Sequence, residues 1–592
     1  MLHPWTGTPG LWRTITVHSA FGGCMAVRAP SLQGLGIAFV LALAPPAHAQ
    51  PPATLRRPPP RADVILTGGK VFTSDSLHPW AQAVAVRGAR IAAVGTSEEI
   101  ARLAGPRTRR IALNGRVVIP GFNDAHDHLG EPSFGTSFSF GAGPVPDPGL
   151  PEVLDSLRAL AARTPTGTWL HATVGLRFVT DSAAGRAALD KVAPNHPVLL
   201  WGWTGHDVFV NTTAIRALHI NEDVRNPIGG RYIRDVAGRL TGHFDDYAEW
   251  AVLRDFYSSL PDSVLVAGLR TYAAEALRNG ITSVQDMNGY LDPAATARVF
   301  SRARLPMRVR IIPYPIPDAH SMRAHEFDVV PRRLTPLTSV SGVKWILDGT
   351  PIEGRSLMRA RYSDRADSHG ALQFPVDTIR AILANALATH EPLHLHVSGD
   401  STPRLVFALM RSLAPDSAWR RLRVRLEHGD FVSGILARTA RELGVVVVQN
   451  PAHSSLDPAM VSERFGRVPD DFQTGRSVID AGVPLAFGSD GSPRNPFVQL
   501  MFALTNPLHP TGAFTMAEAV TAYTRGSAYA EFAEREKGTL APGMLADLAV
   551  LSQDIFVVPP QALPGTTSVL TIVGGVMVYD AGKDATRRKM AP

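Results

Sequence analysis

Short apolar runs alternate with helical stretches through the middle of the chain. Most of the runs are rich in Val, Ile and Leu, and several end in a polar or charged residue. Residues 263–278 and 375–388, which lie between runs, have the pattern of helices. Apolar strands separated by helices are typical of parallel β/α units. The candidate strands end at residues 284–286, 308–313, 342–348, 393–397, 424–428, 445–449 and 484–490.

The two ends of the region downstream of residue 61 have a different pattern. Residues 64–72 and 83–95 are short β-type runs separated by Gly-Gly and Arg-Gly turns, which favour hairpins. Residues 546–551 and 568–579 repeat this pattern near the C-terminus. We expect the two ends to pair into one small β-sandwich.

The combined pattern predicts an α/β fold, a (β/α)8 TIM barrel with a small β-sandwich built from both chain ends. The segment after residue 128 is too long for an ordinary loop, so we expect an insertion over the barrel mouth. The predicted divisions are residues 1–49 (upstream extension and signal peptide), 50–61 (Pro-rich tether), 62–119 (N-terminal part of the sandwich), 120–534 (barrel, with the insertion at about 129–260) and 535–592 (C-terminal part of the sandwich).

The first part of the chain has the pattern of a leader for export. Met25 is followed by Arg28, an apolar run at residues 35–44 and Ala47-His48-Ala49. A basic residue, a short apolar run and an Ala-x-Ala site are typical of a secretory signal peptide, here at about residues 25–49. The run is short for a membrane span, which disfavours an uncleaved anchor. We expect a periplasmic or secreted protein without a membrane segment after cleavage, and either Met1 or Met25 as the start.

The formal net charge of +7 does not indicate a nucleic-acid partner. Residues 1–61 contain five arginines and no acidic residue, so most of the excess charge lies in the leader and tether. Downstream, no basic run with interleaved aromatic residues is present. The only cysteine, Cys24, lies in the leader. Any metal site of the mature chain must therefore use histidine, carboxylate or a modified side chain.

A His-x-His pair, His126 and His128, follows the apolar run at residues 117–122. Side chains two apart on a strand share a face, so both imidazoles can reach one metal ion. Such a pair also arises by chance in a chain with 20 histidines. The ends of parallel barrel strands converge on one face, which favours a shared site. Other candidate residues at predicted strand ends are Lys344, His396, His428 and Asp490.

Each of these positions has a structural alternative. Only one of His394 and His396 need be a ligand, and the other is then a core group hydrogen-bonded to backbone. His428 is equally suited to cap the turn at Gly429. Lys344 lies among apolar residues, where a charged ammonium is costly, and its alternative is a salt bridge to an interior carboxylate such as Asp348.

Taken in order, several motifs resemble the amidohydrolase superfamily, in particular its amidohydrolase 3 branch of YtcJ-like and N-substituted formamide deformylase-like proteins. The resemblance extends from Ala62 to Tyr579. It is carried by Pro120 to His128, Gly205-His206 with Asn211, Gly280 to Val284, Val343-Lys344 with Asp348-Gly349, His396 to Asp400, Glu427-His428, Gly488 to Asp490, and Gly538 to Gly543 before Ala546-Asp547.

The resemblance implies a site with two divalent metal ions, most simply Zn²⁺. It implies that carbon dioxide carboxylates Lys344, and that the resulting carbamate bridges the two ions. One ion would then take His126, His128 and Asp490. The other would take His396 and His428.

The implied activity is hydrolysis of a carbon–nitrogen bond in an amide, formamide or cyclic amide, by water that the metals activate. Asp490 is the expected general base and later acid. His206 is expected to hold the carbonyl or the leaving group, with a structural histidine beside Trp203 as the alternative. The expected partner is a small-molecule substrate, and a homodimer is the usual assembly for enzymes of this size.

Three segments depart from the family pattern, namely residues 350–355, 397–398 and 241–246. They leave the substrate open. Two other functions also stay open. The first is a one-metal deaminase-like or esterase-like hydrolase with an unmodified Lys344, and the second is a non-catalytic periplasmic binding protein on the same barrel.

Overall fold

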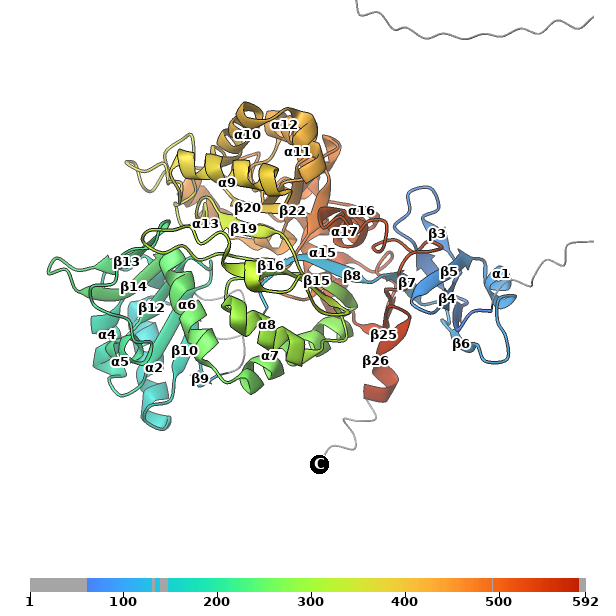
Figure 1. The fold of residues 1–592 in the computed structure, drawn as a ribbon, viewed down its shortest axis with the longest axis horizontal. Coiled ribbons are helices and arrows are strands. Elements are labelled where there is room, and N and C mark those ends of the chain that lie inside the picture. Colours follow the sequence, from blue (N-terminus) through green and yellow to red (C-terminus); the bar gives the residue numbers. More distant parts are fainter. Residues whose placement is uncertain (1–60, 130–133, 139–146, 492, 585–592) are drawn as a thin grey trace, which may run out of the picture. The chain divides into compact units, whose positions relative to one another are not determined.

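The computed structural model describes residues 61–129, 134–138, 147–491 and 493–584. The predicted leader and most of the tether lie outside the described residues. The described part is an α/β structure of strands and covering helices (Figure 1). None of its helices combines the length and the apolar character needed to cross a membrane.

Two sheets of parallel strands form the centre of the molecule. In the first sheet β8, β15 and β16 run parallel, and β18 and β17 extend its edge. In the second sheet β19 to β23 all run parallel. The edge strand β16 contacts β19, and β23 contacts β8. The strands are β8 (Phe122–Asp127), β15 (Ile281–Asn288), β16 (Arg308–Pro313), β17 (Arg333–Thr335), β18 (Thr338–Val340), β19 (Val343–Ile346), β20 (Leu393–Val397), β21 (Arg425–His428), β22 (Val446–Gln449) and β23 (Leu485–Phe487).

Helices follow most of these strands, as the apolar periodicity predicts. The helices predicted at residues 263–278 and 375–388 are confirmed as α7 and α9. The helix after β15 begins where Asp292 caps the nitrogen of Ala295 and Pro293 occupies the first turn. These helices are α7 (Asp262–Arg278), α8 (Pro293–Ala303), α9 (Val376–Thr389), α10 (Thr402–Leu413), α11 (Asp416–Leu422), α12 (Gly434–Leu443), α13 (Pro458–Phe465), α14 (Gly475–Asp480), α15 (Pro496–Thr505), α16 (Met516–Thr521) and α17 (Ser527–Ala530).

The segment predicted as an insertion builds a sheet of its own. Six strands pair in the order β13-β14-β12-β11-β10-β9, and a separate apolar cluster that includes Leu157 and Phe178 fills its core. The helix α6 (Tyr247–Ser259) that follows packs into the main core instead. The other elements are β9 (Thr136–Ser137), α2 (Leu150–Arg163), β10 (Leu170–Val174), α3 (Leu176–Val179), α4 (Arg186–Val192), β11 (Val198–Gly202), β12 (Asp207–Val210), α5 (Thr212–Ala217), β13 (Gly230–Arg234) and β14 (Leu240–Asp246).

The two chain ends meet, as their β-type pattern predicts. Strand β24 near the C-terminus pairs antiparallel with β7, with Ala549 opposite Ile119. A shared apolar cluster contains Leu66 and Val84 from one sheet and Leu548 from the other. The smaller of these two terminal sheets consists of β5 (Arg90–Gly95), β4 (Ala83–Arg87), β1 (Val64–Thr67) and β6 (Arg109–Ala112), and α1 (Ser97–Ala101) follows β5. The larger terminal sheet consists of β26 (Val576–Asp580), β25 (Ser568–Val573), β24 (Leu548–Leu551), β7 (Val117–Pro120), β2 (Lys70–Phe72) and β3 (Trp80–Ala81).

Gly121 joins β7 of the terminal sheets directly to β8 of the central sheets. Its nitrogen donates to the carbonyl oxygen of Asp547 at 3.0 Å. A Cβ at this position would lie 2.2 Å from the side chain of Thr282, so only glycine fits. This close approach sets where the strand that carries His126 begins.

Candidate metal centre

Three predicted ligands converge at the ends of β8 and β23. His126 is the fifth residue of β8, His128 follows that strand, and Asp490 lies just beyond β23. Asp490 Oδ1 is 3.4 Å from His126 Nε2 and 3.3 Å from His128 Nε2. One ligand atom from each of the three residues lies within 4.8 Å of the others. The structure therefore brings together the first set of predicted metal ligands.

The other oxygen of Asp490 faces a second pair of histidines. Asp490 Oδ2 lies 3.8 Å from His428 Nδ1 and 3.6 Å from His453 Nε2. His428 ends β21, whereas His453 lies in a 3-10 turn at Pro451–Ser455 after β22. His453 was missed by the sequence analysis. Its signal is the position just after a predicted strand end, which is the criterion that found the others.

Two of these residues have a strained backbone. His428 has φ of 69° and Asp490 has φ of 52°, in the left-handed region that favours glycine. Backbone hydrogen bonds hold both conformations. The nitrogen of Asp490 donates to the carbonyl oxygen of His126 at 2.7 Å, and the nitrogen of Gly429, which follows His428, donates to the carbonyl oxygen of Val397 at 3.0 Å. Strain that the surroundings maintain is concentrated at functional sites.

Asp124 forms hydrogen bonds with both segments that carry ligands, the end of β8 and the residues after β23. Its Oδ1 accepts hydrogen bonds from the nitrogens of His126 at 3.2 Å and Ser489 at 3.0 Å. Its Oδ2 accepts from the hydroxyl of Tyr523 at 2.8 Å. Tyr523 belongs to a π-helical turn at Ala522–Gly526 that contacts β8 and β23. A side chain of the closing helical segment thus fixes the spacing between β8 and β23.

A buried ion network fixes the ring of His126. Its Nδ1 lies 2.7 Å from Glu427 Oε2, which leaves Nε2 directed at Asp490. Arg425 donates to Glu427 Oε1 at 2.9 Å, and His394 Nδ1 lies 3.2 Å from the same oxygen. His394 is therefore the core member of the pair His394 and His396, but its partner is a carboxylate and not backbone. A carboxylate behind a histidine is the usual outer support of a metal ligand.

The protonation states suit cation binding. Burial and the nearby Lys344 lower the pKa of His126 to about 4, against the opposing charges of Asp490 and Glu427. Burial likewise lowers the pKa of His428 well below its ordinary value. Burial alone would raise the pKa of Asp490, but the surrounding histidines hold it well below its ordinary value. Neutral imidazoles and an ionised carboxylate are the forms that bind metal ions, so the donor set fits a divalent cation.

Lys344 is buried in β19, with 2% of its surface exposed. Burial lowers its pKa to about 8, against the charges of Glu427 and Asp490. Asp348 is not its partner, because the Asp348 carboxylate accepts instead from the nitrogens of Ser398 and Gly399 and from the Thr402 hydroxyl, at 3.0, 2.9 and 2.7 Å. Carboxylation of Lys344 stays a prediction.

His396 and His206 lie beside the donors but belong to neither three-residue group. The ring centroid of His396 is 4.4 Å from that of His428 and 5.3 Å from that of His206. His206 Nδ1 lies 2.8 Å from Asp246 Oδ1, and Asp246 has φ of 49° and ψ of −123°. Burial would lower the pKa of His206, but Asp246 raises it above its ordinary value. The insertion therefore presents an oriented histidine to the centre.

Arg355, from the segment between β19 and α9, contacts the backbone of that histidine. It lies in the segment 350–355 that departs from the family pattern. Its guanidinium donates to Asp207 Oδ1 at 2.7 Å and to the carbonyl of His206 at 3.3 Å, and lies 3.8 Å from Asp246 Oδ2. Asp246 and Arg355 were not predicted as site residues, because their pairing across the insertion has no local sequence signal.

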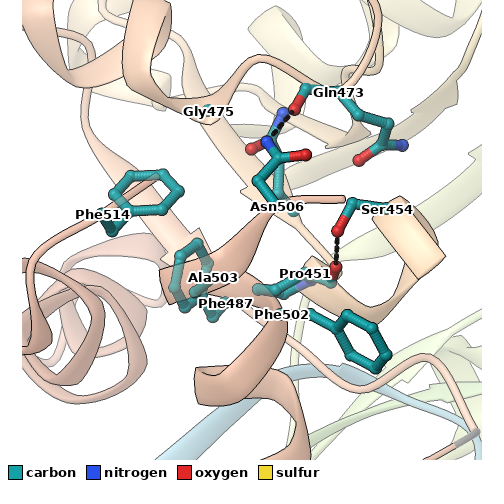
Figure 2. Close-up of a pocket in the computed structure, with 10 residues that line it drawn as sticks. Pro451, Ser454, Gln473, Gly475, Phe487, Phe502, Ala503, Asn506 and Phe514 are labelled. Carbon is teal, nitrogen blue, oxygen red and sulfur yellow. Dashed lines mark hydrogen bonds between the residues drawn. The ribbon is translucent and has the colours of Figure 1, made fainter. Parts of the chain in front are cut away.

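A small cavity is lined in part by the 3-10 turn Pro451–Ser455, as Figure 2 shows. It measures about 10 Å³ and is lined in part by Pro451, Ser454 and Phe514. A space of this size holds about one water molecule, so it is not a substrate pocket. Beside it, Ser454 Oγ donates to the carbonyl of Pro451 at 2.7 Å within the turn (Figure 2).

The fold matches that of solved metal-dependent hydrolases. An uncharacterized metal-dependent hydrolase from Pyrococcus horikoshii OT3 superimposes with a TM-score of 0.65 at 19% identity, over 84% of this chain and 99% of that chain. The chain belongs to the amidohydrolase family, because the profile of that family matches residues 109–579. The resemblance to the amidohydrolase 3 branch is thereby confirmed.

Two curated relatives extend over nearly the same length. The N-substituted formamide deformylase of Arthrobacter pascens is 26% identical over 88% of this chain and 98% of its own. The Bacillus subtilis protein YtcJ, itself named as an amidohydrolase, is 24% identical over 87% of this chain and 99% of its own. Family, fold and donor groups together make this protein a metal-binding hydrolase.

Proposed function

We propose that this protein is an exported amidohydrolase that cleaves a carbon–nitrogen bond of an amide, formamide or cyclic amide. The observation that carries the proposal is the convergence of His126, His128 and Asp490 at the ends of parallel strands. The deformylase relative, which matches over nearly its whole length, supports the choice of bond.

We also propose the finer architecture that the sequence predicts. The contacts of β16 with β19 and of β23 with β8 support closure of the two sheets into a (β/α)8 barrel. The apolar cluster shared by the two terminal sheets supports a β-sandwich. In such barrels the carboxyl ends of the strands form the active-site face, which is where the candidate centre lies.

The residues present fit two divalent ions, with zinc the simplest choice for imidazole and carboxylate donors. His126, His128 and Asp490 would hold one ion, and His428 with His396 and a Lys344 carbamate would hold the other. Bound metal ions of this kind lower the pKa of a water molecule and polarise a carbonyl oxygen.

Asp490 would be the general base and then the general acid. It accepts a proton from the water that adds to the carbonyl carbon, and it returns a proton to the nitrogen as the carbon–nitrogen bond breaks. His206, fixed at Nδ1 by Asp246, would direct Nε2 toward the carbonyl oxygen or the leaving group. The products are a carboxylic acid and an amine.

The direct test is a screen of the zinc-reconstituted mature protein against formamides, N-acyl amino acids, lactams and esters. We expect turnover of one carbon–nitrogen class, lowered about 10²- to 10⁴-fold in Asp490→Asn. Turnover of esters alone would overturn the choice of bond, and specific binding without turnover would indicate a binding protein. The mass of the mature N-terminus tests export, which predicts cleavage after Ala49.

A further inference from the structure

The ring of His396 contacts a buried hydroxyl just after β20. His396 Nε2 lies 3.3 Å from the hydroxyl oxygen of Ser398, a residue that is 1% exposed. Ser398 belongs to the pair at residues 397–398 that departs from the family pattern. With Nε2 in this contact, Nδ1 is the ring nitrogen of His396 that remains for a cation.

The backbone around Ser398 is fixed by Asp348. The nitrogen of Ser398 donates to Asp348 Oδ1 at 3.0 Å, and the nitrogen of Gly399 donates to Asp348 Oδ2 at 2.9 Å. A Cβ at Gly399 would lie 2.2 Å from the carbonyl oxygen of Leu357, so only glycine fits there. These contacts fix where the hydroxyl of Ser398 lies relative to the ring of His396.

A second buried side chain, Asp430, lies next to the hydroxyl of Ser398. The Asp430 carboxyl forms a side-chain hydrogen bond with this hydroxyl, and its Oδ1 accepts another from Gln473 Nε2. The backbone nitrogen of Gln473 donates to the carbonyl oxygen of Asp430 at 2.8 Å, and the carbonyl oxygen of Gln473 accepts from Asn506 Nδ2 at 3.2 Å (Figure 2). Gln473, Asp430 and Ser398 therefore form a chain of side-chain hydrogen bonds that ends on the ring of His396.

Two other predicted ligands have the same kind of support on one ring nitrogen. Glu427 Oε2 lies 2.7 Å from His126 Nδ1, and Asn450 Oδ1 lies 2.9 Å from His428 Nδ1. Such outer partners fix which ring nitrogen carries the hydrogen and how the ring is oriented. In these two rings the contact leaves Nε2 for a cation, whereas in His396 it leaves Nδ1.

We propose that Ser398 is a positioning residue of the metal centre, which holds His396 so that Nδ1 binds the second divalent cation together with His428. A neutral imidazole with a cation on Nδ1 carries its hydrogen on Nε2, where the oxygen of Ser398 accepts it. The hydroxyl hydrogen of Ser398 is then donated to Asp430. This inference rests on the metal centre of the proposed function, but not on which bond the enzyme cleaves.

The test measures zinc binding by the mature protein in bicarbonate buffer, with Zn²⁺ as the only added metal. Elemental analysis counts the bound zinc, and competition with a chromophoric chelator gives the affinity of each site. We expect two equivalents in the wild type. In Ser398→Ala the second site should bind about 10- to 100-fold more weakly while the first keeps its affinity, because loss of an outer contact typically has an effect of this size.

The matched control is Ser568→Ala. Ser568 is a fully buried serine of β25 in the larger terminal sheet, and its hydroxyl donates to the carbonyl oxygen of Leu570 at 2.8 Å. Its loss should lower stability and leave the affinity of both zinc sites unchanged. Melting curves of the metal-free variants identify any that fail to fold.

Unchanged affinity of both sites in Ser398→Ala would overturn the inference, and so would equal weakening in Ser398→Ala and Ser568→Ala. A single equivalent in the wild type would overturn it too, but would leave a one-metal hydrolase. A wild type that binds no zinc would instead overturn the proposed function. A crystal structure of the zinc-loaded wild type is a test that needs no variant: we expect Nδ1 of His396 on the second ion, and Nε2 on that ion would contradict the role of Ser398.

Discussion

The central-sheet side and the insertion side of the centre position their side chains in different ways. On the central-sheet side, strand ends and backbone hydrogen bonds place the donors, and His428 and Asp490 are held in the left-handed region. On the insertion side, His206 is oriented by an ion network with Asp246 and Arg355. From this difference we expect the central-sheet side to hold the metals and the insertion side to orient the substrate. Variants on the two sides should therefore separate metal binding from turnover.

The largest effect is expected for Asp490→Asn, which removes the proton acceptor and weakens both donor groups. General-base loss alone corresponds to a decrease in kcat of about 10²- to 10⁴-fold. The zinc content should fall in the same variant. A variant with full zinc and near-normal kcat would remove Asp490 from both roles.

Glu427→Gln should weaken zinc binding at the His126 group by about 10- to 100-fold, because Glu427 fixes the imidazole from behind. Arg425→Met should act similarly and also destabilise the fold by about 3–5 kcal/mol, since Glu427 is left buried without its cation. Chelator competition and denaturant titration measure the two effects.

The matched control is Arg310→Met. Arg310 is also a buried arginine, but it donates to the hydroxyl of Ser341 and to Gln285, and it reaches Glu427 only through His394. It should lower stability with little change in zinc affinity. Equal zinc loss in both arginine variants would show that burial, and not the contact with Glu427, is responsible.

On the insertion side, Arg355→Met should leave the zinc content unchanged and lower kcat by about ten- to 100-fold, because a displaced catalytic group costs up to about 10²-fold. Arg231→Met is the control, since Arg231 pairs with Asp245, the neighbour of Asp246 in the chain, but its side chain is 64% exposed and it does not contact His206. Loss of zinc in Arg355→Met would contradict the division between the two sides.

The smallest effect concerns the stability of the metal-free protein. The contributions of His126 and His206 to the free energy of unfolding should depend on pH with opposite sign. The folded pKa of His126 is lowered to about 4 from 6.5, so the unfolded chain binds its proton first and stability falls as the pH drops from about 6.5 toward 4. The folded pKa of His206 is raised, so its contribution is present below about 6.5 and is lost as the pH rises through the folded value.

The measurement is the free energy of unfolding of the wild type, His126→Asn and His206→Asn between pH 4 and 9. The value for each variant is subtracted from that of the wild type at the same pH. The expected slopes reach about 1.4 kcal/mol per pH unit. Slopes of the same sign would contradict the assignment of a neutral imidazole to His126 on the central-sheet side and of a proton-binding imidazole to His206 in the insertion.

Much of the centre follows from sequence because a strand end is a local feature. The apolar run before His126, and those before His428 and Asp490, predict where each strand ends, and parallel strands bring those ends together. His453 lies in a turn whose path depends on the hydrogen bond that the nitrogen of Ala452 donates to Gln499, a residue 47 positions away. The same holds for Arg355, whose partner Asp207 is far away in the chain.

The sequence by itself determined the family, the order of strands and helices, and the residue types available to a metal, because these depend on periodicity and local motifs. Only the tertiary structure decided that His394 supports Glu427 while His396 lies beside His428. It also decided that each oxygen of Asp490 faces its own pair of histidines. The physical reason is that both outcomes are contacts between side chains of different strands. Such contacts depend on how the strands are placed next to each other in the fold, which no local pattern in the sequence specifies.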